Sequence, residues 1–246
     1  MQSNNSPATG GARGLNIVIT GASKGIGRAM AEIFAAHGND LYICARGVAA
    51  LYKTMDELTT RYSSISVKSK PVDLSIKDQA QEFGNWCLQQ AIPDILINNA
   101  GLFEPGSVYN EPEGTLESQL SKNLLSAYHL TRTLLPKMME RKTGYIFNIC
   151  SIASLHAYNN GGAYSISKFA LYGFSKNLRE EMKPHGIKVI SVHPGAVMSD
   201  SWGDYDNTSK RIMEASDIAK LIYAATQLSP QACVEEIVIR PQLGDL

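Results

Sequence analysis

Residues 15–34 read Leu-Asn-Ile-Val-Ile-Thr-Gly-Ala-Ser-Lys-Gly-Ile-Gly-Arg-Ala-Met-Ala-Glu-Ile-Phe. An apolar run of strand length passes through a glycine-rich turn into a helical pattern. Gly21, Gly25 and Gly27 would let the backbone turn tightly and approach a pyrophosphate, whose charge a helix N-terminus favours. An ordinary tight turn explains such a glycine cluster too, but its place at the first strand–helix junction favours a dinucleotide site.

The same alternation of strands and helices continues along the chain. Several of the apolar runs are rich in Ile and Val without strict alternation, as expected where helices cover both faces of a parallel sheet. The sequence therefore predicts an α/β fold, a Rossmann-type doubly wound parallel sheet of about seven strands with helices on both faces. The candidate strands are Leu15–Thr20, Asp40–Ala45, Ser64–Ser69, Asp94–Asn98, Tyr145–Cys150, Ile187–Val192 and Glu236–Ile239.

Two helices are expected to begin at recognisable signals. Ser75, with Asp78 three residues on, and Ser216-Asp217 both precede helical patterns and are typical N-terminal caps. Longer helices are expected over Glu113–Glu140 and Ala163–Met182.

The chain has 246 residues, 44% of them hydrophobic, which suffices for the core of one domain over 14–246. Residues 1–13 are rich in Ser, Asn and Gly and are predicted to be a flexible tail, not a signal peptide. Lys plus Arg and Asp plus Glu number 23 each, so no charge favours nucleic acid or an anionic membrane. No apolar run approaches the ~20 residues that cross a bilayer. We therefore expect a cytoplasmic protein without nucleic-acid or membrane partners.

The four cysteines show no short pair spacing. Scattered positions of this kind predict buried, reduced thiols and no metal site. They are Cys44, Cys87, Cys150 and Cys233.

The end of the second strand indicates which dinucleotide binds. NAD-binding versions of this unit carry an acid there, which holds the ribose 2′-hydroxyl. Here that strand ends in Cys44-Ala45-Arg46-Gly47, and Arg46 offers a planar fork suited to phosphate, with Lys24 in the glycine turn. The two cations are also compatible with a solvated surface, but together they favour NADP(H) over NAD(H).

Polar residues follow two further strands. Asp73-Leu74 and Asn98-Asn99-Ala100-Gly101 lie at expected carboxyl ends of strands, which form the ligand edge of an open α/β sheet. Each segment is equally compatible with an ordinary Asx turn.

Chemistry is predicted for Ser151, Tyr164 and Lys168. On the expected helix, Tyr164 and Lys168 lie one turn apart on one face. A phenol with a pKa near about 10 needs a neighbouring ammonium to favour its phenolate. Ser151 follows a strand and could orient the same carbonyl oxygen, with Ser154 as an open alternative. The set predicts proton transfer coupled to hydride exchange with a nicotinamide.

The same helix holds a second Tyr-x-x-x-Lys pair, Tyr172 and Lys176. It lies ~12 Å further along the axis and is rotated by ~80°, so both pairs cannot face one substrate. Tyr164 is nearer the helix N-terminus and the sheet edge. We interpret Tyr172 and Lys176 as structural or surface residues.

Taken together, these motifs resemble those of the short-chain dehydrogenase/reductase family over nearly all of 14–241. The glycine turn, Asn-Asn-Ala-Gly at 98–101 and Pro194-Gly195-Ala196-Val197 match its pattern in order. Its catalytic asparagine, serine, tyrosine and lysine fall on Asn123, Ser151, Tyr164 and Lys168.

The resemblance implies roles that spacing alone does not. Lys168 would also bind the nicotinamide ribose, Asn123 would anchor a water that relays protons, Asp73 would contact the adenine and Val197 the carboxamide. Ser199 stands where the family usually has threonine. The cofactor-binding residues implied are Gly21, Ser23, Lys24, Gly25, Ile26, Gly27, Arg46, Asp73, Leu74, Asn99, Ala100, Gly101, Tyr164, Lys168, Pro194, Gly195, Val197 and Ser199.

The resemblance also implies a homo-oligomer, a dimer or homotetramer packed through the helices that carry Asn123 and Tyr164. Residues of these helices that fit such a surface, or equally an internal core, are Leu124, Leu125, Phe169, Leu171 and Phe174.

Substrate contacts are expected, by the same resemblance, from Leu102-Phe103, Ile152–Tyr158 and Ser199–Met213. The last segment is short and polar, with Trp202 and Tyr205 but little aliphatic wall, which favours a small polar substrate. Arg211, Lys210 or His193 could meet a carboxylate, although surface roles are favoured for the two cations. The expected activity is NADP(H)-dependent interconversion of a carbonyl and a secondary alcohol; the alternatives are a 3-ketoacyl-carrier-protein reductase and, remotely, a non-catalytic NADP-sensing protein.

Overall fold

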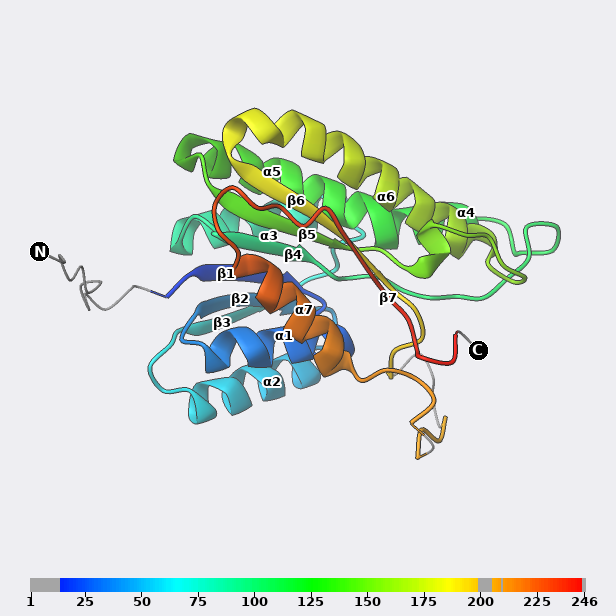
Figure 1. Cartoon of the computed structure of the whole chain (residues 1–246), viewed down its shortest axis with the longest axis horizontal. Coiled ribbons are helices and arrows are strands. Elements are labelled where there is room, and N and C mark those ends of the chain that lie inside the picture. Colours follow the sequence, from blue (N-terminus) through cyan, green and yellow to red (C-terminus); the bar gives the residue numbers. More distant parts are fainter. Residues whose placement is uncertain (1–13, 199–204, 209, 245–246) are drawn as a thin grey trace, which may run out of the picture.

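The computed structural model describes residues 14–198, 205–208 and 210–244. Its centre is a parallel sheet of seven strands in the order β3-β2-β1-β4-β5-β6-β7 (Figure 1). The strands are β1 (Asn16–Thr20), β2 (Asp40–Ala45), β3 (Val67–Pro71), β4 (Ile95–Asn98), β5 (Gly144–Ile149), β6 (Ile187–Pro194) and β7 (Glu236–Ile239). The sequence order reverses between β1 and β4, and this predicted doubly wound α/β architecture is confirmed.

Helices cover both faces of the sheet, as Figure 1 shows, with α1, α2 and α7 on one side and α3 to α6 on the other. Their bounds are α1 (Gly25–Ala36), α2 (Val48–Arg61), α3 (Lys77–Gln90), α4 (Thr115–Leu120), α5 (Ser126–Arg141), α6 (Gly162–Met182) and α7 (Ala215–Thr226). A π-helical turn, η1 (Ser121–Leu125), joins α4 to α5, and short 3-10 turns are η2 (Ile152–Ser154) and η3 (Lys183–His185).

Successive residues of the central strands point to opposite faces and build two cores. Ile17 and Ile19 pack on the side of α1 and α7, whereas Val18 packs on the side of α3 and α5. The central strands are buried on both faces, which explains why their sequences read as continuous apolar runs. The two cores fix the sheet rigidly, so that its carboxyl edge can hold side chains in defined positions.

The third strand begins later than predicted. Ser64–Ser69 was expected, but β3 spans Val67–Pro71 and pairs with β2 at the sheet edge. Ser63 and Ser64 form a turn before it, and the Ser66 amide donates to Asp40 Oδ1 at 2.7 Å. An edge strand is partly solvated, so its weak apolar pattern marks its bounds poorly.

Two predicted helix caps are also wrong. Ser75 does not cap α3; its amide and hydroxyl donate to Asp73 Oδ1 at 3.0 and 2.7 Å, and Ile76 is the N-cap. Helix α7 is capped by Glu214, not Ser216, in a reciprocal pairing with Asp217. A local side-chain bond to the backbone competes with capping, and spacing alone does not reveal which one forms.

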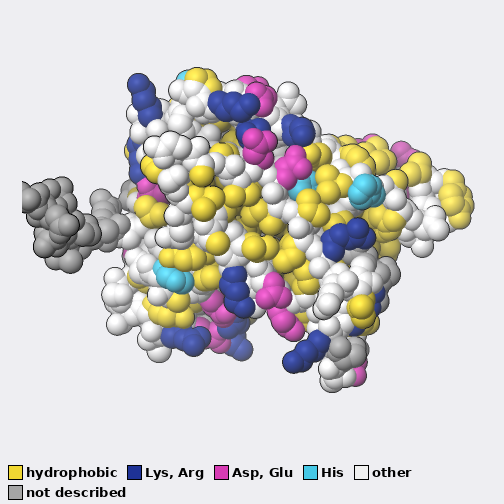
Figure 2. Space-filling model, viewed as in Figure 1, with side chains coloured by type: hydrophobic (Ala, Val, Ile, Leu, Met, Phe, Trp, Pro, Cys, Tyr) yellow, Lys and Arg dark blue, Asp and Glu magenta, His cyan; other side chains and the backbone are white. Residues whose placement is uncertain are grey.

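Three of the four cysteines are buried as predicted, and none forms a disulfide. Cys233 is the exception, because it lies exposed before β7. Within the described part of the chain, no helix is long and apolar enough to cross a membrane. Figure 2 shows basic and acidic side chains interspersed over one face of the molecule.

Candidate active site

The carboxyl ends of the central strands open into a cleft of ≈ 1060 Å³. Nearly all the predicted cofactor and catalytic residues line it, although they come from segments far apart in the sequence. Those lining the cleft are Gly21, Ser23, Lys24, Gly25, Ile26, Gly27, Arg46, Asp73, Leu74, Asn99, Ala100, Gly101, Ser151, Tyr164, Lys168, Pro194, Gly195 and Val197. Ser199 and Trp202 lie outside the described residues.

The glycine turn after β1 packs against Asn99, which follows the neighbouring strand β4. Gly21 and Gly25 have φ of 66° and 53°, a region that L side chains rarely adopt. A Cβ on Gly27 would lie 2.2 Å from Gly21 O and 2.6 Å from Asn99 Nδ2. Asn99 Nδ2 donates to Thr20 O at 2.9 Å. The turn therefore requires glycine and leaves a cradle at the start of α1 that suits a pyrophosphate.

Positive side chains surround the outer part of the cleft. Arg46 is exposed directly after β2, and Lys24 stands at the N-cap of α1. For Asp73, burial acts to raise the pKa, but hydrogen bonds from Ser75 and the charges of Arg46 and Lys122 outweigh it and lower the pKa. Asp73 is therefore ionised at neutral pH, and hydrogen bonds from Ser75 hold its carboxylate near Arg46 and Lys122.

The two candidate serines have different environments. Ser151 lines the cleft and caps η2, where its Oγ accepts from the Ala153 amide at 3.1 Å. Ser154 is fully buried, and its Oγ accepts from the Ser151 amide at 3.1 Å. Only the Ser151 hydroxyl therefore faces the cavity, and Ser154 fixes the turn that presents it.

Tyr164 lies in the first turn of α6, with its ring edge-on to Phe103 at a centroid distance of 4.8 Å. Burial raises the pKa of Tyr164 to about 12, and hydrogen bonding with Ser151 opposes this rise. The expectation that a neighbouring ammonium lowers this pKa is wrong for the structure as it stands. The protein enclosure disfavours the phenolate, so the phenol is protonated at neutral pH.

Lys168 is buried one turn after Tyr164. Its Nζ donates to Ile149 O at 2.8 Å and lies 5.9 Å from the centroid of the Tyr164 ring. Burial lowers the pKa of Lys168 from 10.5 to about 8. The ammonium is thus directed at a backbone carbonyl, and burial disfavours its charged form.

Asn123 lies behind the cleft and not on its wall. It is 1% exposed within the π-helical turn. Its Oδ1 accepts from the Leu102 amide at 2.8 Å, and its Nδ2 donates to Gln119 Oε1 at 2.7 Å and Ser167 Oγ at 2.9 Å. The side chain therefore ties the loop after β4 to helices α4 and α6. A Cβ on Gly101 would lie 2.8 Å from Asn123 Oδ1, so this junction is tightly packed.

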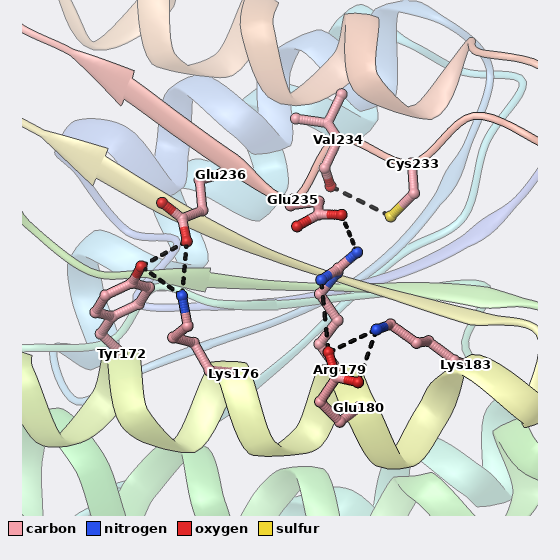
Figure 3. A network of polar contacts seen from close by, with 9 residues as sticks. All are labelled: Tyr172, Lys176, Arg179, Glu180, Lys183, Cys233, Val234, Glu235 and Glu236. Atoms are coloured by element: carbon pink, nitrogen blue, oxygen red, sulfur yellow. Dashed lines mark hydrogen bonds and ion pairs between the residues drawn. The ribbon is translucent and has the colours of Figure 1, made fainter.

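The second Tyr-x-x-x-Lys pair lies outside the cleft, as predicted. Figure 3 shows Tyr172 and Lys176 reaching from α6 to Glu236 on β7. The Tyr172 hydroxyl donates to Glu236 Oε1 at 2.5 Å and Lys176 Nζ donates at 3.3 Å, while Arg179 pairs with Glu235. These contacts fasten the last strand to the helix.

The predicted carboxylate-binding cations are not at the cleft. His193 is completely buried, with Nδ1 3.2 Å from Ser151 O, so it cannot meet a substrate. Arg211 donates to Gly244 O at 2.8 Å, and Lys210 is not among the described residues that line the cleft. Among the described residues, Arg240, directly after β7, is a cation that does line the cleft.

Sequence reasoning missed several polar residues of the cleft wall, among them Lys122, Ser126 and Arg240. Arg240 could have been found, because the carboxyl end of every strand in such a sheet lies at the ligand edge. Lys122 and Ser126 carried no signal, since they lie within a helical stretch.

The model of the family described as short chain dehydrogenase matches residues 15–210. The chain therefore belongs to the short-chain dehydrogenase family, as the motifs predicted. A sepiapterin reductase of Chlorobaculum tepidum is 30% identical over 239 residues, which cover 94% of this chain and 97% of that protein.

Two solved structures are similar throughout. An alcohol dehydrogenase from the archaeon Thermococcus sibiricus, complexed with 5-hydroxy-NADP, has a TM-score of 0.87 at 25% identity, with 94% of this chain and 98% of that chain covered. A metagenomic short-chain oxidoreductase in complex with NADP has a TM-score of 0.81 at 29% identity, with coverage of 93% and 97%.

Proposed function

We propose that this NADP(H)-dependent oxidoreductase of the short-chain dehydrogenase family interconverts a carbonyl and a secondary alcohol. The observation that carries the proposal is the single cleft that contains both the glycine cradle and the Ser151, Tyr164 and Lys168 side chains. Loss of NADPH absorbance with carbonyl substrates is the test, with Tyr164→Phe as the variant that separates chemistry from binding.

The proposed cofactor fits the residues present. Gly21, Gly25 and Gly27 form the turn at the start of α1, and a Cβ on Gly27 would clash with Gly21 O and Asn99 Nδ2, so this turn depends on glycine. Arg46 and Lys24 supply charge for a 2′-phosphate. Two similar proteins carry NADP or 5-hydroxy-NADP in their crystals, which further supports NADP(H) over NAD(H).

Bound NADPH would supply the hydride, and residues of this chain would donate the proton to the substrate. The Tyr164 phenol would donate its proton to the carbonyl oxygen, and the Ser151 hydroxyl would hold that oxygen by a hydrogen bond. Lys168 would stabilise the charge left on the phenolate and bind the nicotinamide ribose. Asn123 would keep the loop at Gly101 and the helix of Tyr164 in register. By the family resemblance, Asn123 would also anchor a water molecule that relays protons from Lys168.

Since Lys168 must act as a cation, we expect kcat/KM to fall as pH rises through about 8. Its pKa lies at about 8 instead of 10.5 because burial disfavours the ammonium, so the charged form prevails below about 8 and is lost above it. A pH profile of kcat/KM reports this group in the free enzyme. Lys168→Arg should remove the fall while slowing the reaction. A profile that is flat to pH 10 in the wild type would contradict the assignment.

We propose a small polar substrate that carries an anionic group near Arg240. This side chain follows Ile239, whose carbonyl accepts from the Gly195 amide at 2.8 Å, so it stands beside the proposed nicotinamide end of the cleft. A guanidinium suits a carboxylate.

Arg240→Ala should raise KM for 3-oxo acids by at least about tenfold, since a hydrogen bond to a charged group contributes about 1.5–3 kcal/mol. KM for neutral ketones should change less than about twofold. Steady-state kinetics on both classes decides the matter, and equal increases on both would contradict a carboxylate site at Arg240. Arg211→Ala is the matched control, because Arg211 binds the C-terminal segment.

We propose a homo-oligomer in the cytoplasm that packs through α5 and α6. Support comes from Leu125, the last residue of η1 before α5, and from Phe169 on α6, which are 38% and 43% exposed. Leu171 does not belong to this surface, because it is buried in the core. Sedimentation of the purified protein should give the mass of two or four chains, and a monomer would contradict the proposal.

A further inference from the structure

The loop between β4 and α4, residues 101–114, is fastened to the segment that leads into α6. The Gly106 amide donates to Asn160 O at 3.0 Å, and Ser107 Oγ donates to Asn160 Oδ1 at 2.8 Å. Asn160 has a φ of 58°, a conformation that asparagine tolerates better than most residues. In Figure 1 this loop projects beside the end of α6 that lies near α4.

Glu111, in the same loop, supplies the cap that α6 lacks. The first amides of a helix have no partner within it, and the N-cap residue Gly161 offers no side chain. Glu111 Oε1 accepts from the Ala163 amide at 2.8 Å, although the two residues are 52 positions apart. A carboxylate at this end also interacts favourably with the helix dipole.

The contact between Glu111 and the start of α6 leaves room only for glycine at two neighbouring positions. Gly162 has a φ of 33°, and a Cβ there would lie 1.9 Å from Glu111 Oε1 and 2.5 Å from Gly106 O. A Cβ on Gly106 would lie 2.7 Å from Glu111 Cγ. Glycine at both positions therefore allows the carboxylate to reach the helix end.

The loop also contacts Tyr164 itself, through Phe103 near the start of the loop. The Ala163 amide that Glu111 binds belongs to the residue before Tyr164, and the Phe103 ring lies edge-on to the Tyr164 ring. The loop therefore holds both the backbone that enters Tyr164 and the face of its phenol. Errors of about 1 Å in the placement of a reacting group are enough to slow a reaction by about 100-fold.

We infer that Glu111 is a positioning residue, which fixes the phenol of Tyr164 relative to Ser151 by capping the first turn of α6. The inference rests on the proposed role of Tyr164 as the proton donor. Glu111 does not line the cleft, so its effect should fall on kcat and not on cofactor affinity.

Three variants separate the hydrogen bond from the charge. Glu111→Gln keeps an oxygen that can accept from Ala163 but has no charge. Glu111→Asp keeps the charge, yet its side chain is one methylene shorter and cannot reach. Glu111→Ala removes both. Glu113→Ala is the control, because Glu113 is an exposed acid of the same loop.

We would measure kcat on the best carbonyl substrate, the Kd of NADPH by its fluorescence, and amide exchange of residues 162–168. Glu111→Ala and Glu111→Asp should lower kcat by about 10- to 100-fold and speed exchange at the start of α6, with Kd within about twofold. Glu111→Gln and Glu113→Ala should stay near wild type.

Two results would overturn the inference: wild-type kcat and exchange in Glu111→Asp, or a loss in Glu111→Gln as large as in Glu111→Asp. If Glu111→Ala does not fold, the comparison of Glu111→Asp with Glu111→Gln still tests whether the hydrogen bond to Ala163 positions Tyr164. A wild-type protein without turnover would count against the proposed function, while the exchange measurement would still test the cap.

Discussion

Replacing Tyr164 by Phe should lower kcat/KM by about 100- to 10,000-fold, the usual contribution of a general acid. The variant keeps the ring that packs edge-on against Phe103, so the fold and the shape of the cleft should be unchanged. Only the hydroxyl that would donate the proton is lost. Initial rates of NADPH oxidation and the Kd of NADPH together measure the effect, and Kd should remain within about threefold, because binding rests mainly on the glycine cradle.

The chain provides its own control in the second Tyr-x-x-x-Lys pair. Tyr172 lies two turns further along α6 and donates to Glu236 outside the cleft. Tyr172→Phe should therefore leave kcat/KM within about twofold and lower the free energy of unfolding by no more than about 1.5 kcal/mol. If Tyr172→Phe abolished activity and Tyr164→Phe did not, the assignment of the proton donor would be wrong.

Replacing Arg46 by Asp should raise the KM of NADPH by about 100-fold and improve the use of NADH. Hydrogen bonds to a charged group contribute about 1.5–3 kcal/mol, and the new carboxylate would repel a 2′-phosphate while accepting from a 2′-hydroxyl. Arg46 is exposed, so the difference should shrink as salt screens it. Kinetics with both cofactors at two ionic strengths measures this.

Lys53→Asp makes the same change of charge on α2, where Lys53 is 73% exposed and pairs with Glu57. It should leave the preference between the cofactors unchanged, because Lys53 does not line the cleft. An Arg46→Asp enzyme that still preferred NADPH as strongly as the wild type would show that Arg46 does not select the cofactor.

The fold could be predicted because the central strands are buried on both faces and so carry continuous apolar runs. Where that burial ends, the prediction became less accurate: β3 is partly exposed at the sheet edge, and its bounds were placed three residues too early at the N-terminal end. The N-caps of α3 and α7 were also predicted wrongly, because local hydrogen bonds compete with capping. Ser75 bonds locally to Asp73, and sequence spacing does not distinguish such a bond from a cap.

Those residues of the cleft that belong to recognisable sequence motifs were predicted correctly. Gly27 and Arg46 lie where the strand–helix pattern placed them, and the structure separates Ser151 from Ser154, which spacing left open. Arg240 was missed although the rule for strand ends applied to it. His193 was wrongly expected at the substrate, because its burial depends on the packing of α6 and β6 and not on local sequence.

Two properties of the site lay beyond sequence reasoning. The pKa of Tyr164 depends on enclosure by several segments, which outweighs the neighbouring ammonium that the sequence shows. The bond from Ala163 to Glu111 joins residues 52 positions apart and requires the φ of Gly162. Such effects arise only when distant segments meet in the folded chain.

The most direct test of a carbonyl–alcohol oxidoreductase that uses NADP(H) is the loss of NADPH absorbance with a panel of small ketones, diketones, 3-oxo acids and an acetoacetyl thioester. We expect turnover of at least one small polar carbonyl, absent with Tyr164→Phe and slower with NADH. Turnover of the thioester alone would favour a 3-ketoacyl-carrier-protein reductase. Tight binding of NADPH with no turnover of any carbonyl would contradict the account and favour a cofactor-sensing protein.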